Sequence, residues 1–350
     1  MTCKCEVLTH QTEDTILSNH RMNYSLIHES PTEHRRRILS NSVENKILND
    51  LYKEDKSWYL KEPFIEGKAP QLVIFIQTRD DAASQRDFIR STWANKSYYY
   101  DGIGRHPFVF FVCGLDPCCH RMNDNLTTEI LANKDILLVN IHDTYDNLTL
   151  KGVLAMHWIL KTMGDSVKYV IKTDDDVMLN IFRWMSVLKS LSLRNKSKFI
   201  LGFVWQKSKV KRNGKYIVNE EEYPEQYYPS FCAGPGYAIS RDAIVTLLNM
   251  TSHVRYLKRE DVFITGLLAA AGRVSRYSFS KNSYILYSYQ YQKNNNLEST
   301  MLVHGGDKLL QRYIWNLYVD KKKLNAHVVT KYFFVTSLMW PEEVNPRSRQ

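Results

Sequence analysis

The sequence predicts an α/β fold with a mainly parallel central sheet flanked by helices. Short apolar runs rich in β-branched and aromatic residues alternate with longer segments whose apolar residues recur at helical spacing. Such alternation is typical of βαβ units, in which the strands run parallel. The 350 residues are 44% hydrophobic and contain only 14 Gly and 10 Pro. The chain can therefore bury a substantial core, and collagen-like or low-complexity structure is excluded.

The expected elements follow from these runs in order. Residues 1–65 form a polar lead-in, with a helix expected from His34 to Tyr52. Apolar β-forming runs predict strands at 72–76, 108–112, 136–139, 169–171 and 199–204. Helical spacing predicts helices at 84–93, 126–132, 148–163, 180–191, 242–250, 262–271 and 309–318. Ser84 is a candidate N-cap, and His157, on the apolar stripe of its helix, is interpreted as a core histidine.

Three segments lack this regularity. Residues 207–219 are basic and rich in turn residues, which favours a hairpin or a mobile loop. Two glycines flank Pro235, a pattern that fits either an ordinary tight turn, the interpretation favoured here, or close approach of the backbone to a ligand. Residues 275–300 are rich in Tyr, Ser and Asn and are expected to be irregular.

The chain carries a net charge of +10. A basic excess admits nucleic-acid binding. However, the tightest basic runs, at 35–37, 207–215 and 321–323, do not interleave with aromatic residues along one face. Diffuse positive charge also suits an enzyme that binds anionic nucleotide sugars, and each single run is best explained as solvated surface. No nucleic-acid partner is therefore expected.

Cysteines and glycosylation acceptors bear on the compartment. The six cysteines lack a paired C-x-x-C spacing, which argues against structural zinc and leaves disulfide pairing open. Asn-x-Ser/Thr occurs about twice as often as random composition would give, which favours the secretory lumen. These sites are Asn23, Asn95, Asn125, Asn147, Asn195 and Asn249. No run of 18 apolar residues predicts a membrane span, and residues 1–50 hold no apolar core for a signal peptide.

Three adjacent carboxylates, Asp174, Asp175 and Asp176, follow the predicted strand 169–171. Adjacent anions repel one another and are easiest to tolerate where water or a cation offsets the charge. Hard divalent cations prefer oxygen ligands and often bind through one or two carboxylates plus substrate phosphates. Ligands of parallel sheets bind beyond the carboxyl ends of the strands. A metal–diphosphate site is therefore favoured over a solvated acidic turn.

A second acidic site, Glu260 and Asp261, immediately precedes the predicted helix 262–271. Carboxylates are favoured at a helix start, so capping alone would explain them. With an upstream metal site they gain a second interpretation. Sugar transfer from a nucleotide diphosphate needs a cation that neutralises the leaving group and a base that takes a proton from the acceptor hydroxyl. Two separate carboxylate sites would meet both needs.

Six blocks in order resemble the Golgi β1,3-galactosyltransferases and β1,3-N-acetylglucosaminyltransferases, over roughly Gln71 to Trp315. The blocks are Arg86 to Trp93 (R-x-x-I-R-x-T-W), Phe110 to Gly114 (an apolar strand ending in Gly), Asp143 to Lys151 (D-x-Y-x-N-L-T-x-K), Lys172 to Val177 (K-T-D-D-D-V), Tyr228 to Tyr237 (Y-P-x-Y-x-x-G-x-G-Y) and Glu260 to Val262 (E-D-V). Phe231 replaces a Tyr, and Asn140 and Ile141 stand where relatives usually have Asp and Phe. Six blocks in the right order make the resemblance specific.

The resemblance implies a GT-A type nucleotide-sugar transferase domain at residues 66–325, after a stem-like region at 1–65 and before a C-terminal tail at 326–350. It implies inverting transfer of galactose, or N-acetylglucosamine, from a UDP-sugar donor to the 3-hydroxyl of an acceptor glycan, glycoprotein or glycolipid. Mn²⁺ would be the cofactor.

The resemblance also implies roles for single residues. Asp176 would bind the metal, Asp174 and Asp175 would lie against the metal or the nucleotide ribose, and Asp261 would be the general base. His304, in a stretch similar to the family's V-H…W segment, is a candidate metal or diphosphate contact.

Three basic residues, Arg86, Arg90 and Lys172, are candidate donor contacts by the same resemblance. For the two arginines an ion-paired structural role is the alternative, and Thr92 and Trp93 are interpreted as structural.

Members of this family are type II membrane proteins, so a Golgi lumenal location is expected, with membrane contact only through an N-terminal anchor. That anchor is absent from this sequence, and truncation or a soluble form would account for it. The alternative function is a non-catalytic UDP- or glycan-binding protein on the same fold, against which the presence of Asp176 and Asp261 argues.

Overall fold

The computed structural model describes residues 47–50, 58–67, 70–99, 106–115, 124–193, 195–279, 283–286, 297, 300–328 and 342–343. The strands are β1 (Tyr59–Lys61), β2 (Leu72–Gln77), β3 (Phe108–Gly114), β4 (Ile136–Val139), β5 (Tyr169–Asp174), β6 (Val177–Leu179), β7 (Phe199–Trp205), β8 (Phe231–Ser240), β9 (Ser275–Ser278), β10 (Tyr284–Ile285), β11 (Leu302–His304) and β12 (Glu342–Glu343). The α-helices are α4 (Ala83–Arg90), α5 (Asp124–Asn133), α6 (Leu148–Met163), α7 (Ile181–Leu193), α8 (Arg241–Met250), α9 (Ala269–Ala271) and α10 (Lys308–Val328). Short 3₁₀ turns η1 (Lys96–Tyr99), η2 (Tyr145–Asn147) and η3 (Gly164–Ser166) and the π-helix η4 (Val262–Leu268) complete the order.

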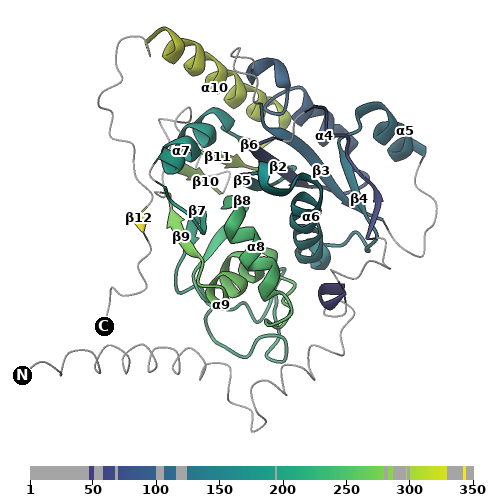
Figure 1. Cartoon of the computed structure of the whole chain (residues 1–350), viewed down its shortest axis with the longest axis vertical. Coiled ribbons are helices and arrows are strands. Elements are labelled where there is room, and N and C mark those ends of the chain that lie inside the picture. Colours follow the sequence, from purple (N-terminus) through teal and green to yellow (C-terminus); the bar gives the residue numbers. More distant parts are fainter. Residues whose placement is uncertain are drawn as a thin grey trace, which may run out of the picture.

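The strands form a large sheet in the order β1-β4-β3-β2-β5-β8-β7-β9-β12 and a small sheet in the order β10-β11-β6 (Figure 1). Strands β4, β3, β2 and β5 run parallel. Strand β8 runs antiparallel between β5 and β7. The predicted α/β class, with parallel central strands flanked by helices, is confirmed. The alternation of elements gave no indication of the antiparallel β8.

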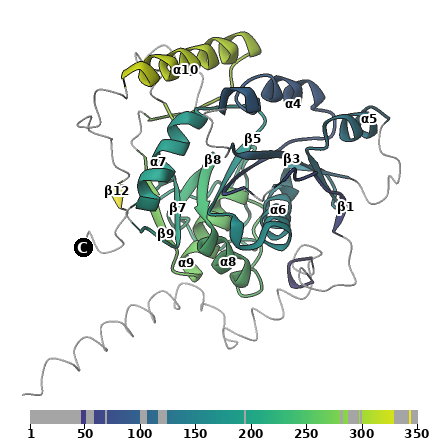
Figure 2. The same cartoon turned by 45° about the horizontal axis from the view of Figure 1, so that its top comes forward.

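Helices cover both faces of the large sheet, as Figures 1 and 2 show. Alternate residues of each strand point to opposite faces. Val73 and Phe75 of β2 therefore pack with α6 and α8 in one core cluster. Ile74 and Ile76 pack with α4, α5, α7 and α10 in the other. Both faces are buried, which explains why β2 is a continuous apolar run without polar alternation.

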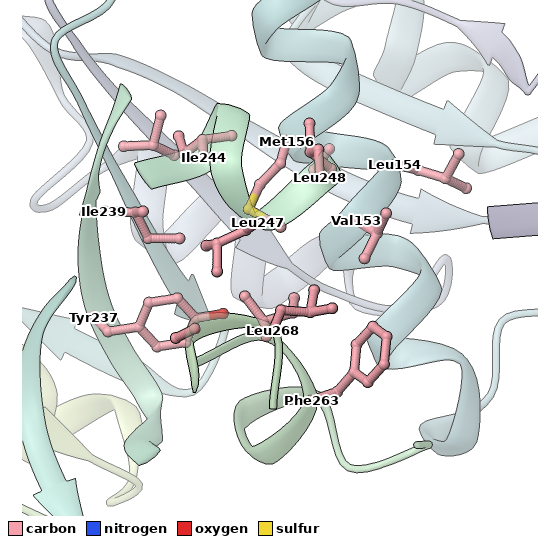
Figure 3. Close-up of a cluster of buried hydrophobic side chains, with 14 of the residues drawn as sticks. Val153, Leu154, Met156, Tyr237, Ile239, Ile244, Leu247, Leu248, Phe263 and Leu268 are labelled. Carbon is pink, nitrogen blue, oxygen red and sulfur yellow. The ribbon is translucent and has the colours of Figure 1, made fainter. Parts of the chain in front are cut away.

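The first core cluster holds the segment that follows the second acidic site. Figure 3 shows Met156 of α6 close to Leu247 and Leu248 of α8, with Phe263 and Leu268 of the η4 region beside them. These side chains are essentially buried. Burying one such side chain stabilises the fold by about 1.5–3 kcal/mol. The turn that begins at Asp261 is thus held in place by the hydrophobic core.

Several boundaries differ from the prediction. The expectation that Ser84 is the N-cap of α4 was wrong: the N-cap is Ala82, two residues earlier, and Ser84 lies inside the helix. Strand β9 lies within 275–300, which was expected to be irregular. Residues 47–49 are helical, and the rest of the helix expected at 34–52 lies outside the described residues. His157 is hydrogen-bonded to Tyr59 at 2.7 Å, in keeping with a structural role.

The Gly-Pro-Gly segment is part of β8, so the tight turn favoured from the sequence was wrong. Gly236 pairs with Thr173 of β5. Four residues of β8, 233–236, face the single residue Phe203 of β7, which leaves Pro235 in a bulge where its missing N–H costs no ladder hydrogen bond. A Cβ on Gly236 would lie 2.7 Å from Leu302 Cδ2, so this strand does require close backbone approach.

Two cysteines lie in the described part of the chain, Cys113 and Cys232, and both are buried free thiols. Among the helices that the structure describes, none is both long enough and apolar enough to cross a bilayer.

Candidate active site

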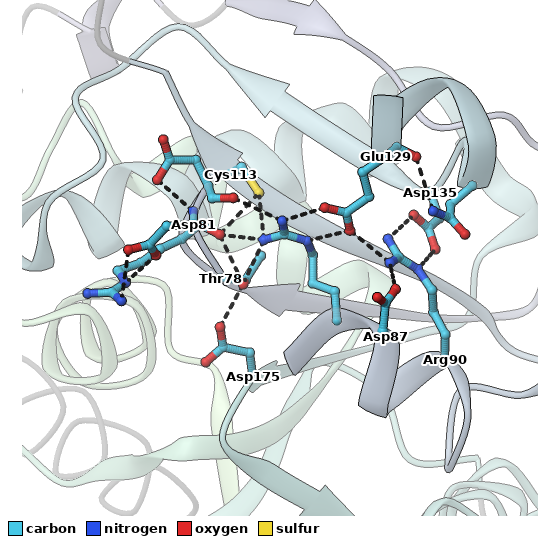
Figure 4. Close-up of polar contacts among 12 residues, drawn as sticks. Thr78, Asp81, Asp87, Arg90, Cys113, Glu129, Asp135 and Asp175 are labelled. Atoms are coloured by element: carbon cyan, nitrogen blue, oxygen red, sulfur yellow. Dashed lines mark hydrogen bonds and ion pairs between the residues drawn. The ribbon is translucent and has the colours of Figure 1, made fainter. Parts of the chain in front are cut away.

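The carboxyl ends of β2 and β5 lie side by side and form the floor of the site. The register pairs Gln77 with Asp174, so Thr78 and Asp175 leave the sheet next to each other. Thr78 Oγ1 donates a 2.6 Å hydrogen bond to Asp175 Oδ2, as Figure 4 shows. Burial raises the pKa of Asp175, the hydrogen bond from Thr78 lowers it in part, and the charges of Asp176 and Asp174 raise it again.

Asp176 and His304 form a corner beside this floor. Strand β11 runs antiparallel to β6 and pairs His304 with Val177, which places the imidazole next to the last residue of the acidic triplet. His304 Nε2 lies 3.2 Å from Asp176 Oδ2, and His304 Nδ1 lies 3.0 Å from the Leu286 carbonyl oxygen. The hydrogen bond to Asp176 raises the pKa of His304 to about 9. Burial raises the pKa of Asp176, but the hydrogen bond and the charge of His304, together with smaller contributions, outweigh burial and lower the pKa overall.

The spacing of this pair fits two ligands of one cation. Two adjacent ligands of an octahedral ion with bonds of about 2.1 Å lie about 3 Å apart. Among the residues that the structure describes, no group of three or more His, Cys, Asp or Glu side chains surrounds a common point. A divalent cation held by two protein ligands usually completes its shell with phosphate oxygens and water.

Lys172 forms ion pairs with a carboxylate of each acidic site. Its Nζ lies 2.8 Å from Asp174 Oδ1 and 3.1 Å from Glu260 Oε2, and it donates to the Gly234 carbonyl oxygen at 2.9 Å. The lysine side chain is only 2% exposed. Burial lowers the pKa of Lys172, but the two carboxylates outweigh it and raise the pKa overall. These three partners match the three N–H donors of the ammonium group, so the geometry favours a role in holding the site together over direct donor contact.

Glu260 is buried, and the Tyr237 hydroxyl donates a hydrogen bond to its Oε1. Burial raises its pKa to about 7, opposed by the positive charge of Lys172 and by the hydrogen bond from Tyr237.

Asp261, the next residue, lies at the N-cap of η4 and accepts a 2.9 Å hydrogen bond from the Val262 N–H. The expectation that a carboxylate caps this helix is thus confirmed for Asp261. Burial raises the pKa of Asp261, while the charges of Arg259 and Lys172 lower it in part. Its Oδ2 lies close to Gly234, where a Cβ would come within 3.4 Å.

One cleft of about 1000 Å³ connects these groups. It is lined by Lys172, Asp174, Asp175, Asp176, Asp261 and His304. The structure therefore brings together the acidic triplet and the second acidic site, which lie far apart in the sequence. The cleft is large enough for a small-molecule ligand of substantial size.

Arg86 and Arg90 do not line this cleft. Arg86 is fully buried and forms a bidentate pair with Glu129, at 2.7 and 2.6 Å. Arg90 bonds Asp135 through two nitrogens and also contacts Glu129 (Figure 4). With their donors bound to protein acceptors, both arginines fit the ion-paired structural alternative.

Most residues that line the cleft were not predicted as site residues, and Thr78, Arg79 and Lys151 are three of them. Lys151 Nζ donates to Asp143 Oδ1 and to the Thr78 carbonyl oxygen, each at 2.7 Å. Thr78 and Arg79 follow β2 directly, so the rule that ligands bind beyond the carboxyl ends of parallel strands could have identified them.

Comparison with known proteins shows the family to which the chain belongs. The family model described as Galactosyltransferase matches residues 84–280, more than half of the chain. Beta-1,3-galactosyltransferase 5 of Mus musculus is 30% identical over 223 residues, covering 63% of this chain and 70% of the relative. UDP-GalNAc:beta-1,3-N-acetylgalactosaminyltransferase 1 of Rattus norvegicus is 30% identical over 222 residues, covering 61% of this chain and 64% of the relative. The chain thus spans less than two thirds of the rat relative.

Among solved structures, a glycosyltransferase involved in the glycosylation of the major capsid of PBCV-1 aligns with a TM-score of 0.39 and 8% identity, covering 71% of this chain and all of that one. The sequence matches place the chain among the glycosyltransferases. It belongs to the galactosyltransferase family, as its six sequence blocks predicted.

Proposed function

We propose that this protein transfers galactose, or N-acetylglucosamine, from a UDP-sugar to the 3-hydroxyl of an acceptor glycan, with inversion at the anomeric carbon. The observation that carries the proposal is that the Asp176–His304 corner and Asp261 open into one cleft. Family membership supports the reaction class, and relatives named for β1,3-transfer support the linkage.

The donor would bind at the Asp176 end of the cleft. Asp176 and His304 would hold a divalent cation, with Mn²⁺ proposed, and Asp174 and Asp175 would lie against the metal or the nucleotide ribose. When bound, the cation would neutralise the diphosphate leaving group. His304 is fixed by the Leu286 carbonyl oxygen, so its Nε2 is directed at Asp176 with little freedom.

The acceptor would bind at the Asp261 end. Its 3-hydroxyl oxygen would attack the anomeric carbon and form the new glycosidic bond, while the bond from that carbon to the diphosphate oxygen breaks and UDP keeps the electron pair. The hydroxyl proton would pass to the Asp261 carboxylate. Burial raises the pKa of Asp261 above that of an ordinary aspartate, which strengthens it as a base.

Two substitutions separate the roles in this proposal. Asp261→Asn should retain metal-dependent UDP binding and lower kcat at least a hundredfold, the usual contribution of a positioned base. Asp176→Ala should abolish metal-dependent UDP binding. Asp124→Asn is the matched control, because Asp124 is an exposed carboxylate in α5 that does not line the cleft.

The assays are calorimetric titration of UDP with and without Mn²⁺, and transfer from UDP-galactose and UDP-N-acetylglucosamine to a panel of small acceptors. Near-full transfer by Asp261→Asn would refute the base assignment. Metal-dependent UDP binding without transfer or donor hydrolysis by the wild type would favour the non-catalytic binding protein instead.

A Golgi lumenal location is part of the proposal. The acceptor asparagines Asn125, Asn195 and Asn249 are all exposed, so oligosaccharyltransferase could reach them. Digestion of the full chain from a secretory host with an endoglycosidase should lower its apparent mass. An unchanged mass would argue against passage through the secretory lumen.

A further inference from the structure

Four side chains form a cluster at the Asp261 end of the cleft: Tyr145, Lys215, Tyr216 and Arg259. We call it the tyrosine–cation cluster. The two tyrosine rings lie 6.3 Å apart between centroids and are tilted by 39°. The Arg259 Cζ lies 5.4 Å from the Tyr145 centroid and 4.6 Å from that of Tyr216, and the Lys215 Nζ lies 5.6 Å from each. Both rings contact both cations.

The cluster is assembled from three separate segments. Tyr145 begins the turn η2 before α6, Lys215 and Tyr216 lie in the connection between β7 and β8, and Arg259 precedes the second acidic site. Arg259 Nη1 donates a 2.9 Å hydrogen bond to the Tyr145 hydroxyl, which ties two of the segments together. Each tyrosine remains 45% exposed, so ring surface is available to a ligand.

Asp261 is the main negative charge that acts on Arg259, but neither cation of the cluster forms an ion pair with a described residue. Among the described residues, no carboxylate oxygen lies within 4.0 Å of Arg259 or Lys215. Neighbouring Lys258, by contrast, is paired with Glu222 at 3.4 Å. Lys209 and Lys211 line the same cleft and are exposed without an ion pair in the described part of the chain. An anion entering here would therefore meet several unpaired cations.

The two ends of the cleft thus differ in charge. The Asp176 end carries three carboxylates and suits a cation. The Asp261 end carries the tyrosine–cation cluster. Of the neighbouring positive charges, that of Arg259 lowers the pKa of Asp261 most. A nucleotide diphosphate needs the metal and so belongs at the acidic end, which leaves the basic end for the other substrate.

Flat aromatic faces suit the apolar side of a sugar ring, and an arginine and a lysine above them suit an anion. We propose that the tyrosine–cation cluster is an acceptor subsite for a glycan whose sugar at or next to the accepting residue carries an anionic substituent, a carboxylate or a sulfate. This rests on the proposed function, because it assigns the acceptor side of that reaction.

The test compares a neutral disaccharide acceptor with the same disaccharide carrying a 6-O-sulfate, and with a matched one in which a uronic acid supplies a carboxylate. The wild type should show a KM about fivefold to tenfold lower for at least one anionic acceptor, the gain expected from one or two contacts to a charged group. The arm with the larger gain identifies which anion the subsite takes.

Variants assign that gain to named side chains. Lys215→Gln should raise the KM of the anionic acceptor about fivefold to tenfold more than it raises the KM of the neutral acceptor. Tyr216→Ala should raise the KM of neutral and anionic acceptors alike, because it removes stacking surface. Lys207→Gln is the matched control, an exposed lysine on the same connection that does not line the cleft.

A direct binding experiment separates this inference from the proposed function. Ligand-observed NMR would measure binding of the same disaccharides to the full chain saturated with UDP and Mn²⁺. Anion-preferring, Lys215-dependent binding without any transfer would uphold the subsite and refute the transferase. Transfer with no anion preference would overturn the subsite alone, and so would a Lys215→Gln effect confined to the KM of the UDP-sugar. Absence of both binding and transfer would overturn both.

Discussion

Glu260 should make the stability of this protein depend on pH in an unusual direction. Four groups face its carboxyl: Lys172, Tyr237, Asp174 and the adjacent Asp261. Burial raises its pKa from 4.5 to about 7, although Lys172 acts against the shift. An acid whose pKa is higher in the folded state binds its proton more tightly there. Below pH 4.5 Glu260 is mostly protonated in both states and does not lower the stability of the fold. Between pH 4.5 and 7 the unfolded state ionises Glu260 more readily than the folded state, so the free energy of unfolding falls as the pH rises.

The size of the effect follows from the shift. One unit of pKa is worth about 1.4 kcal/mol, so ionisation of Glu260 should cost the folded state about 3 kcal/mol between pH 4.5 and 7.5. Lys172 has its pKa raised and stays charged throughout this window, so it adds no pH dependence. Glu260→Gln removes the titration and retains an oxygen that can accept from Tyr237.

The expected result concerns the difference in unfolding free energy between Glu260→Gln and the wild type, measured by urea denaturation of the full chain at pH 4.5, 6.0 and 7.5. Whatever its value at pH 4.5, this difference should move by about 3 kcal/mol in favour of the variant as the pH rises to 7.5. A gap that is constant with pH would show that Glu260 titrates normally and would refute the reasoning.

Glu129→Gln is the matched control, because it also removes a buried carboxylate that has cationic partners. Burial raises the pKa of Glu129, but the hydrogen bonds from Arg86 and Arg90 outweigh it, so the pKa is lowered. The stability from this group is present above pH 4.5 and lost as the pH falls through the folded-state pKa. Its variant should therefore show a deficit that stays constant between pH 5.5 and 7.5.

Three further substitutions test how the site is held. Arg86→Met should destabilise the fold by about 3–5 kcal/mol in urea denaturation, because it leaves Glu129 without its bidentate partner, and should not change the UDP affinity of the folded protein; a selective loss of UDP affinity would restore the donor-contact interpretation. Gly236→Ala should cost about 1–3 kcal/mol of stability, since its Cβ would meet Leu302 at 2.7 Å; a fully stable variant would show that β8 can move away from β11. Gly234→Ala should leave both stability and kcat largely unchanged, since its Cβ would meet Asp261 Oδ2 at 3.4 Å, an ordinary van der Waals contact; a large loss of kcat would show that the cleft needs the space above Gly234.

Much of the fold could be predicted because its signals are local. Helix α6 begins at Leu148 and ends at Met163 as predicted, since its apolar stripe is long and a glycine follows it. Strand β4 and the position of the acidic triplet at a strand end were predicted for the same reason: a short apolar run ends where polar residues begin.

What the sequence could not show depends on distant partners. A proline between two glycines reads locally as a turn, and it is accommodated in β8 only because the pairing with β7 bulges there. His304 was expected at the metal site from the family resemblance alone, and it lies beside Asp176 because β11 pairs with β6. Arg86 is buried only because Glu129, on another helix, meets it. None of these pairings leaves a local trace in the residues themselves.

Glu260 and Asp261 are consecutive in the sequence but have different surroundings and different proposed roles. Successive residues at a helix start point in different directions, so one side chain can enter the core while the next faces solvent. Glu260 enters the core and closes the network with Lys172 and Tyr237, which links β5, β8 and η4. Asp261 faces the cleft, and within the described part of the chain the Val262 N–H is the one hydrogen-bond donor to its carboxylate. The network thereby holds the Asp261 backbone at a set distance from the acidic triplet, because Lys172 contacts Asp174 with the same nitrogen that contacts Glu260. Loss of Lys172 should therefore impair donor binding and proton transfer together, whereas loss of Asp261 should impair only the second.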